Sequence, residues 1–408
     1  MGRNDDQHLA TPTGILVTER AIGARLTQFE ATPGVIDLAW GHPDPRLLPV
    51  RELASATQRA LDRYGSDILE YGSTAGSPPL IDFICARLAD TDARAPEPAA
   101  VVITSGASGG LDLVATLMLA LGDTVLLDVP TYHLAIRIFA DHPVRLQAVA
   151  SDDDGIVLDD LAGIVTQLRR DGQRPRLLYT IPTFNNPSGR NVSLERRAEL
   201  VEFAAREDLL VAEDDTYREL SYDGPPPPSL WALDRAGVVI RIGSFAKSVA
   251  PGMRLGYVTT TPEIATRMAE GGLLDSGGGM NHFAATVLAE YAAGGDYVRG
   301  VERFRDAYRA QRDRLLEGLA AHLPDTASWS KPGGGFFAWV QLPTGIGADE
   351  LAPVALAHGV AFLPAHRFFL DRDAAPGAIR LAFSMYPPET LEDATARLGD
   401  AIRSISAR

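Results

Sequence analysis

The feature that constrains this chain most strongly is a series of short apolar runs, most of which end at glycine, proline or polar residues. They span residues 101–104, 124–129, 144–149, 176–181, 209–213, 238–242 and 255–260. Apolar runs of this length predict buried strands, and helical patterns lie between several of them. Strands that alternate with helices are typical of a doubly wound α/β sheet, which binds ligands beyond the carboxyl ends of its strands. We therefore predict an α/β fold with a functional site at that edge of the sheet.

The segment that follows the run 238–242 carries the most reactive group. Gly243 is predicted to end the strand, and Ser244, Lys247 and Arg254 then follow within a few residues. An amine held in an apolar site loses its charge and attacks carbonyl carbons. A hydroxyl and an arginine fork suit a phosphate dianion. A carbonyl compound that carries a phosphate is pyridoxal 5′-phosphate (PLP); the alternative is an ordinary surface lysine and arginine in a turn.

A glycine-rich stretch follows the first apolar run. Residues 105–110 are predicted to form a turn and residues 111–121 a helix. Backbone N–H groups at a helix N-terminus, together with the helix dipole, favour an anion. Gly106, Ala107 and Ser108 are therefore candidate phosphate ligands. Dinucleotide binding is the competing interpretation, but the stretch has neither a P-loop lysine nor a complete Rossmann fingerprint.

Three further residues, each polar or aromatic, are candidates for contact with a ligand. Tyr132 follows a strand, and its ring either lies on a flat heterocycle or caps the core. Asn186 stands before a proline, where its amide either donates to an anionic oxygen or only shapes a turn. Arg380 lies in the strand-like alternation 379–384. A buried guanidinium needs an anion, and a carboxylate matches its two donors.

Several short motifs occur in one order along the chain. They are Gly41-His42-Pro43-Asp44-Pro45, Tyr71-Gly72, Asn186-Pro187-Ser188-Gly189, Asp214-x-x-Tyr217, Ser244-Phe245-Ala246-Lys247 and Ala250-Pro251-Gly252-Met253-Arg254-Leu255-Gly256-Tyr257. This set resembles the class I/II aminotransferases of PLP fold type I, especially the 2-aminoadipate and regulator-derived branch. The resemblance covers roughly residue 38 to the C-terminus. It implies a large domain with a mostly parallel seven-stranded sheet and a smaller α+β domain.

The resemblance also implies roles for individual residues. Lys247 would hold PLP as an aldimine and act as the general base, and Asp214 would keep the pyridine nitrogen protonated. Tyr132 would stack on the ring. The remaining cofactor-binding residues would be Gly106, Ala107, Ser108, Asn186, Tyr217, Ser244 and Arg254, and Tyr217 would belong with Lys247 and Asp214 to the catalytic set.

Substrate and partner residues follow from the same resemblance. Gly41, Asn186 and Arg380 would bind the substrate, with Arg380 on its α-carboxylate. Tyr71 would reach the cofactor phosphate of a partner subunit, so a homodimer with shared active sites is expected. The chain departs from the family at Ser108 and its neighbour Gly109, where glutamines are usual, and in the glycine-rich stretch 276–283.

Domain limits can be placed approximately. We expect an arm over residues 1–49 that joins the small domain, a PLP-binding domain over 50–290 and a small C-terminal domain over 291–408. Residues 16–29 form an amphipathic segment within the arm, and residues 296–322 form a long helical pattern.

Composition excludes several classes of protein. The formal charge of −15 opposes binding to nucleic acid. The single cysteine, Cys85, excludes an internal disulfide framework and a cysteine metal cluster, and the acidic run at 151–155 lacks a calcium-loop spacing. No apolar stretch reaches the roughly 18 residues of a membrane span, and the N-terminus lacks an apolar signal core. A cytoplasmic enzyme without a metal is therefore expected.

The predicted reaction moves an amino group between an amino acid and a 2-oxo acid. The same residues would support a PLP-dependent decarboxylase, oxidative deaminase or side-chain substitution enzyme. A ligand-sensing regulator domain is a further alternative. It is disfavoured because only about 36 residues precede the predicted fold, too few for a winged helix, and because the charge is acidic.

Overall fold

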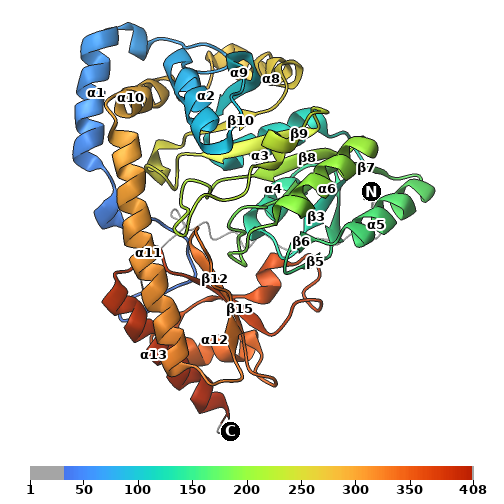
Figure 1. Cartoon of the computed structure of the whole chain (residues 1–408), viewed down its shortest axis with the longest axis vertical. Helices are drawn as coiled ribbons and strands as arrows, with labels where there is room; N and C mark the ends of the chain where they lie inside the picture. Colours follow the sequence, from blue (N-terminus) through green and yellow to red (C-terminus); the bar gives the residue numbers. More distant parts are fainter. Residues whose placement is uncertain (1–31, 407–408) are drawn as a thin grey trace, which may run out of the picture.

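The computed structural model describes residues 32–406, and its larger lobe is built on one sheet (Figure 1). The strand order is β2-β10-β9-β8-β7-β3-β4. β10 runs antiparallel to both neighbours, and the other pairs are parallel. The predicted α/β fold with a mostly parallel, seven-stranded sheet is confirmed. The strands are β2 (Val101–Thr104), β3 (Asp123–Asp128), β4 (Arg145–Val149), β7 (Arg174–Thr180), β8 (Leu210–Asp214), β9 (Val239–Ser244) and β10 (Gly256–Thr259).

Helices bury both faces of this sheet, because alternate residues of each strand point to opposite sides. Val125 and Leu127 of β3 share an apolar cluster with α3, α4, α8 and α9, whereas Leu126 belongs to a cluster with α5, α6 and α7. Helices α1, α2 and α10 cover the β2 end of the sheet. The helices of this lobe are α1 (Val50–Tyr64), α2 (Pro78–Asp92), α3 (Gly106–Met118), α4 (His133–Ala140), α5 (Leu158–Arg170), α6 (Leu194–Arg206), α7 (Leu230–Leu233), α8 (Pro262–Ala269), α9 (Gly272–Gly277) and α10 (His282–Ala293).

The smaller lobe is a four-stranded sheet, ordered β11-β12-β15-β14, packed against helices. The long helix α11 runs from the larger lobe to the smaller one (Figure 1). β1 pairs with β13, so both ends of the described chain meet in this lobe.

The domain limits stay a prediction, and the expected arm segment 16–29 lies outside the described residues. The elements are β1 (Ile36–Asp37), α11 (Asp296–His322), β11 (Ser328–Trp329), β12 (Phe337–Gln341), α12 (Ala348–Ala357), β13 (Val360–Ala361), β14 (Leu363–Pro364), β15 (Ala378–Ala382) and α13 (Pro388–Ser406), with the hairpin β5 (Ser151–Asp152) and β6 (Gly155–Ile156) at the large lobe.

Two glycine-based predictions were wrong in detail. The stretch 105–110 is not a turn, because α3 already begins at Gly106. A methyl group on Gly110 would lie 3.3 Å from Ile242 Cγ2, so this glycine lets the helix lie close to the sheet. Gly243 does not end β9 either, which continues to Ser244. A methyl group on Gly243 would lie 2.2 Å from Tyr257 Cζ, so the bare backbone makes room for that ring.

Candidate active site

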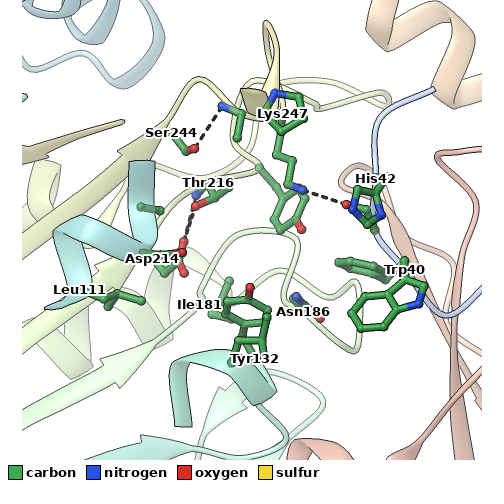
Figure 2. Close-up of a pocket in the computed structure, with 18 of the residues that line it drawn as sticks. Trp40, His42, Leu111, Tyr132, Ile181, Asn186, Asp214, Thr216, Ser244 and Lys247 are labelled. Atoms are coloured by element: carbon green, nitrogen blue, oxygen red, sulfur yellow. Dashed lines mark hydrogen bonds between the residues drawn. The ribbon is translucent and has the colours of Figure 1, made fainter. Parts of the chain in front are cut away.

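A cavity of about 760 Å³ lies beyond the carboxyl ends of β3, β7, β8 and β9, facing the smaller lobe (Figure 2). The predicted site residues that line it are Gly41, Ala107, Ser108, Tyr132, Asn186, Asp214, Tyr217, Ser244, Lys247, Arg254 and Arg380. This is the edge at which open α/β sheets bind ligands, as predicted.

Lys247 reaches into the cavity from the loop after β9. Its Nζ donates a hydrogen bond to the Gly41 carbonyl oxygen at 2.8 Å (Figure 2). The amine also lies 5.3 Å from the centre of the Phe336 ring and 6.0 Å from that of Tyr217. Burial lowers the pKa of Lys247 to about 8, and the positive charges of Arg380 and Arg254 act in the same direction. An amine with this pKa is partly uncharged near neutral pH and is suited to nucleophilic and base chemistry.

Asp214 is the last residue of β8, and its carboxylate is held by three donors. Oδ1 accepts from Thr216 Oγ1 at 2.6 Å and from the Thr216 backbone N–H at 3.3 Å (Figure 2). Oδ2 accepts from the Tyr179 hydroxyl at 2.9 Å. Burial raises the pKa of Asp214, and these hydrogen bonds oppose the rise. The carboxylate is thus presented to the cavity in a fixed orientation.

Arg380 crosses from β15 of the smaller lobe to the cavity. Its Nη1 donates to Asn186 Oδ1 at 2.7 Å, and its Nη2 donates to the Ala39 carbonyl oxygen. The guanidinium carbon lies 4.0 Å from the centre of the Phe337 ring. Burial lowers the pKa of Arg380 to about 10. Among residues 32–406, Arg380 forms no ion pair, and its buried Nε lacks a partner. An anion entering the cavity would meet an uncompensated charge.

The two neighbouring asparagines differ in what they contact. Asn185 shapes the turn, because its Oδ1 accepts from the Ser188 backbone N–H at 3.0 Å and from the Ser188 hydroxyl at 2.9 Å. Asn186 lines the cavity and is the residue that contacts Arg380. The geometry therefore places Asn186 rather than Asn185 in the site.

The start of α3 lies at the cavity, which Ala107 and Ser108 of its first turn line. Ser105 provides no side-chain cap, so the N–H groups of the first turn lack a side-chain acceptor. Arg254 Nη2 donates to the Ser105 carbonyl oxygen at 3.1 Å. A methyl group on Gly106 would lie 2.6 Å from Arg254 Nη2, so the bare backbone here lets the guanidinium approach the helix. Free N–H groups beside a guanidinium fit a phosphate dianion, as the prediction requires.

The other predicted residues are distributed as follows. Burial raises the pKa of Tyr132 to about 12, and its ring lies near Asn186 and Ile181 (Figure 2). Tyr217 packs edge-on against Phe336 and Phe337, at 5.4 Å and 5.8 Å between ring centres. Ser244 lines the cavity, and its Oγ accepts from the Ala246 backbone N–H at 3.1 Å.

Two predicted site residues do not line the cavity: Gly106, which begins α3 beside it, and Tyr71. The side chain of Tyr71 is 85% exposed. The adjacent residues are tightly packed instead: a methyl group on Gly279 would lie 2.1 Å from the Ser73 carbonyl oxygen, and one on Gly278 would lie 2.9 Å from Tyr71 Cβ. The glycine-rich stretch that departs from the family thus holds the Tyr71 segment.

Several residues of the site were missed by sequence reasoning. Cavity-lining residues outside the prediction are Trp40, His42, Leu111, His133, Leu134, Ile181, Thr216, Ala246, Pro251, Gly252 and Phe337. Trp40 and His42 flank Gly41, and His133 follows Tyr132, so proximity in sequence to predicted residues was the available signal. Burial lowers the pKa of His133 to about 3, which keeps that imidazole neutral.

Two further properties bear on the chemistry of the described chain. Residues 32–406 contain no group of three histidine, cysteine, aspartate or glutamate side chains placed to hold a metal ion. None of the described helices is long and apolar enough to cross a membrane.

Comparisons with known proteins all point to one family. The sequence matches the model of aminotransferase class I and II over residues 33–398. It is 31% identical over 392 residues to the aromatic-amino-acid aminotransferase 1 of Thermococcus litoralis, covering 95% of this chain and 94% of that relative.

Solved structures agree. The multiple substrate aminotransferase of Thermococcus profundus superposes with a TM-score of 0.86 at 33% identity, over 92% of this chain and 93% of that chain. The α-aminoadipate aminotransferase of Thermus thermophilus, solved with N-(5′-phosphopyridoxyl)-L-leucine, gives 0.82 at 32% identity, over 92% and 94%. The predicted fold type I is confirmed, and amino-group transfer is favoured over the decarboxylase, deaminase, substitution and regulator alternatives. The chain belongs to the class I and II aminotransferases.

Proposed function

We propose that this aminotransferase moves an amino group between an amino acid and a 2-oxo acid with PLP bound in the cavity. The observation that carries the proposal is the convergence of one amine, one buried carboxylate and two guanidiniums, from Lys247, Asp214, Arg254 and Arg380, on the same space of about 760 Å³. When bound, PLP supplies an electron sink for the charge that develops at the substrate's α-carbon.

Lys247 and Asp214 would do the chemical work. Lys247 would hold the cofactor covalently, and its amine, once freed, would remove the substrate's α-proton and return one. The lowered pKa, about 8, makes the uncharged amine accessible near neutral pH. Asp214 would keep a proton on the ring nitrogen, because a nearby carboxylate favours the charged form of a base.

The remaining residues would bind and orient. Arg254, Ser244 and the backbone of Gly106, Ala107 and Ser108 would take the phosphate. Tyr132 would pack on the ring face, and Asn186 and Tyr217 would donate to the phenolic oxygen. Among these groups, Arg254 and the first-turn N–H groups of α3 have the geometry that a dianion requires.

Arg380 would take the substrate's α-carboxylate, with Asn186 and the Gly41 segment beside it. Support comes from its lack of an anionic partner in the described chain and from its place, with Lys247, among the residues that line the cavity. A bidentate pair there aligns the α-carbon with the Lys247 amine, and orientation of this kind contributes strongly to rate.

We further propose a homodimer in which Tyr71 of each copy completes the phosphate site of the other. Support comes from its exposure of 85%, which is unusual for a tyrosine on a rigidly packed segment, and from its absence from the cavity of its own chain. A cytoplasmic location stays a prediction.

One experiment tests the reaction type. The enzyme is incubated with α-deuterated amino acids, first aromatic ones and 2-aminoadipate because relatives carry those names, and with 2-oxoglutarate. Loss of deuterium together with glutamate formation is the expected result. Release of carbon dioxide, or consumption of oxygen without glutamate, would replace transfer by decarboxylation or oxidative deamination.

A further inference from the structure

Asp214 is a deeply buried carboxylate that the described chain does not neutralise. Its residue exposure is 6%, and among residues 32–406 it forms no ion pair within 4.0 Å. Buried carboxylates are normally paired with a cation or protonated. What stabilises the charge must therefore come from neutral donors.

The donors are placed on both oxygens. Thr216 contributes two of them to Oδ1, its hydroxyl at 2.6 Å and its backbone N–H at 3.3 Å, and Tyr179 contributes its hydroxyl to Oδ2 at 2.9 Å. The Thr216 hydroxyl bond is the shortest of the three, as expected for an O–H donor to an ionised acceptor. Oδ1 accepts two of these bonds and Oδ2 accepts one, so Oδ2 keeps a further lone pair for a ligand in the cavity.

The charged and titratable groups around Asp214 do not supply the missing stabilisation on their own. Tyr179 faces it from β7, Tyr132 and Tyr217 from the cavity wall, Asp215 from the next position and Lys247 from the loop after β9. Burial and Asp215 favour the protonated acid, whereas the hydrogen bonds from Thr216 and Tyr179 favour the anion. The hydrogen bonds from Thr216 and Tyr179 are therefore the contacts that oppose protonation of Asp214.

We propose that Thr216 is a positioning residue whose hydroxyl keeps Asp214 ionised and aimed at the pyridine nitrogen of bound PLP. That the ligand is PLP rests on the proposed function. The ionisation state of the Asp214 carboxylate does not depend on it. Thr216 lies two residues after Asp214, and its hydroxyl and its backbone N–H both donate to Asp214 Oδ1. Because Thr216 also lines the cavity, it can hold this oxygen in place beside a ligand (Figure 2).

The test compares Thr216→Val, which keeps the shape and removes the hydroxyl, with Thr216→Ser, which keeps the hydroxyl. Thr180→Val is the matched control, because Thr180 Oγ1 donates to a different buried carboxylate, Asp128 Oδ2, at 2.8 Å. The first readout is the carboxylic-acid infrared band of the cofactor-free protein as a function of pH. Subtracting the spectrum of the same variant that also carries Asp214→Asn isolates the band of Asp214 in each case.

The valine variant is expected to keep the Asp214 acid band to a pH about one to two units higher than the parent does. In the serine and Thr180→Val variants the Asp214 band is expected to titrate as in the parent. A valine variant whose Asp214 band titrates as in the parent overturns the proposal. Should that variant fail to fold, Thr216→Ala removes the same hydroxyl and is expected to shift the same band, and the absence of a shift there overturns the proposal equally.

The second readout is the dissociation constant of PLP at neutral pH, measured by equilibrium dialysis. Thr216→Val is expected to weaken binding by about tenfold or more, and Thr216→Ser by less than about threefold. Weaker binding without the infrared change would show a packing role and contradict the proposal. Neither readout requires turnover. If the variants show both expected changes but the parent enzyme transfers no amino group, the role of Thr216 stands and only the proposed function is contradicted.

Discussion

The acidity of Lys247 gives the most direct test of how the cavity prepares its amine. A pKa lowered from 10.5 to about 8 corresponds to about 3 kcal/mol of preference for the neutral form. At pH 7 the uncharged fraction rises from about 0.03% to about 10%, roughly a 300-fold gain in nucleophile. Burial is the main cause of the lowered pKa, and the positive charges of the neighbouring arginines add to it. Replacing Arg380 by glutamine is therefore expected to raise the titration midpoint of Lys247.

The chain offers an internal reference for this measurement. Lys247 and Lys331 are the two lysines of the sequence, and Lys331 is exposed. Cofactor-free protein is trace-acetylated across a pH series, and modification at each lysine is quantified by peptide mass spectrometry, with Lys331 reporting the reagent dose. The Lys247 profile is expected to reach its midpoint at about pH 8. A midpoint at or above about 10, the value for an ordinary lysine, would refute the burial argument.

The sign of the linked stability effect follows from the same shift. Because the folded-state pKa of Lys247 lies below its unfolded value of 10.5, the native protein binds fewer protons than the unfolded chain between about pH 8 and 10.5. The contribution of Lys247 to the free energy of unfolding therefore rises with pH across that window and is most unfavourable below it.

Three further outcomes are expected. Asp214→Ala should lower turnover by at least about a hundredfold in a coupled glutamate assay, because the ring nitrogen loses its partner; a rate within about threefold of the parent would reject the role. Arg380→Ala should raise KM for amino and 2-oxo acids by about ten- to a hundredfold with a smaller change in kcat, and a pure kcat effect would remove it from carboxylate binding. Mixing inactive Tyr71→Ala and Lys247→Ala proteins should restore partial activity through hybrid dimers with one sound site, and no recovery despite demonstrated subunit exchange would argue against shared sites.

The strands and the charged residues were predictable because each depends on local signals that tertiary structure preserves. Apolar runs bury themselves whatever their neighbours, and residues after parallel strands meet at one edge. Lys247, Asp214 and Arg254 therefore converge as expected. Arg380 was predictable from its apolar surroundings, since an arginine in a buried strand requires a partner.

The predictions that were wrong, and the contacts that were not predicted, have a different cause. Gly110 and Gly243 look like turn residues in sequence, but their lack of a side chain serves close packing against Ile242 and Tyr257, which only the assembled sheet reveals. The Tyr179 hydroxyl contacts Asp214 from a neighbouring strand, a relation fixed by strand order rather than by spacing. The role predicted for Tyr71 depends on the proposed second copy of the chain, which the structure of one chain does not test.

The contacts of Arg380 have a consequence for how fast the cavity exchanges its contents. The guanidinium donates to Asn186 Oδ1 and to the Ala39 carbonyl oxygen. A carboxylate bound there as proposed would displace at least part of this arrangement, so substrate affinity would be the difference between two sets of hydrogen bonds rather than the full strength of one. These contacts would form again as a product left, which would lower the barrier to release. An enzyme that binds and releases two different acids in each cycle would gain turnover from such moderate affinity, because an arginine without other acceptors would retain each acid longer.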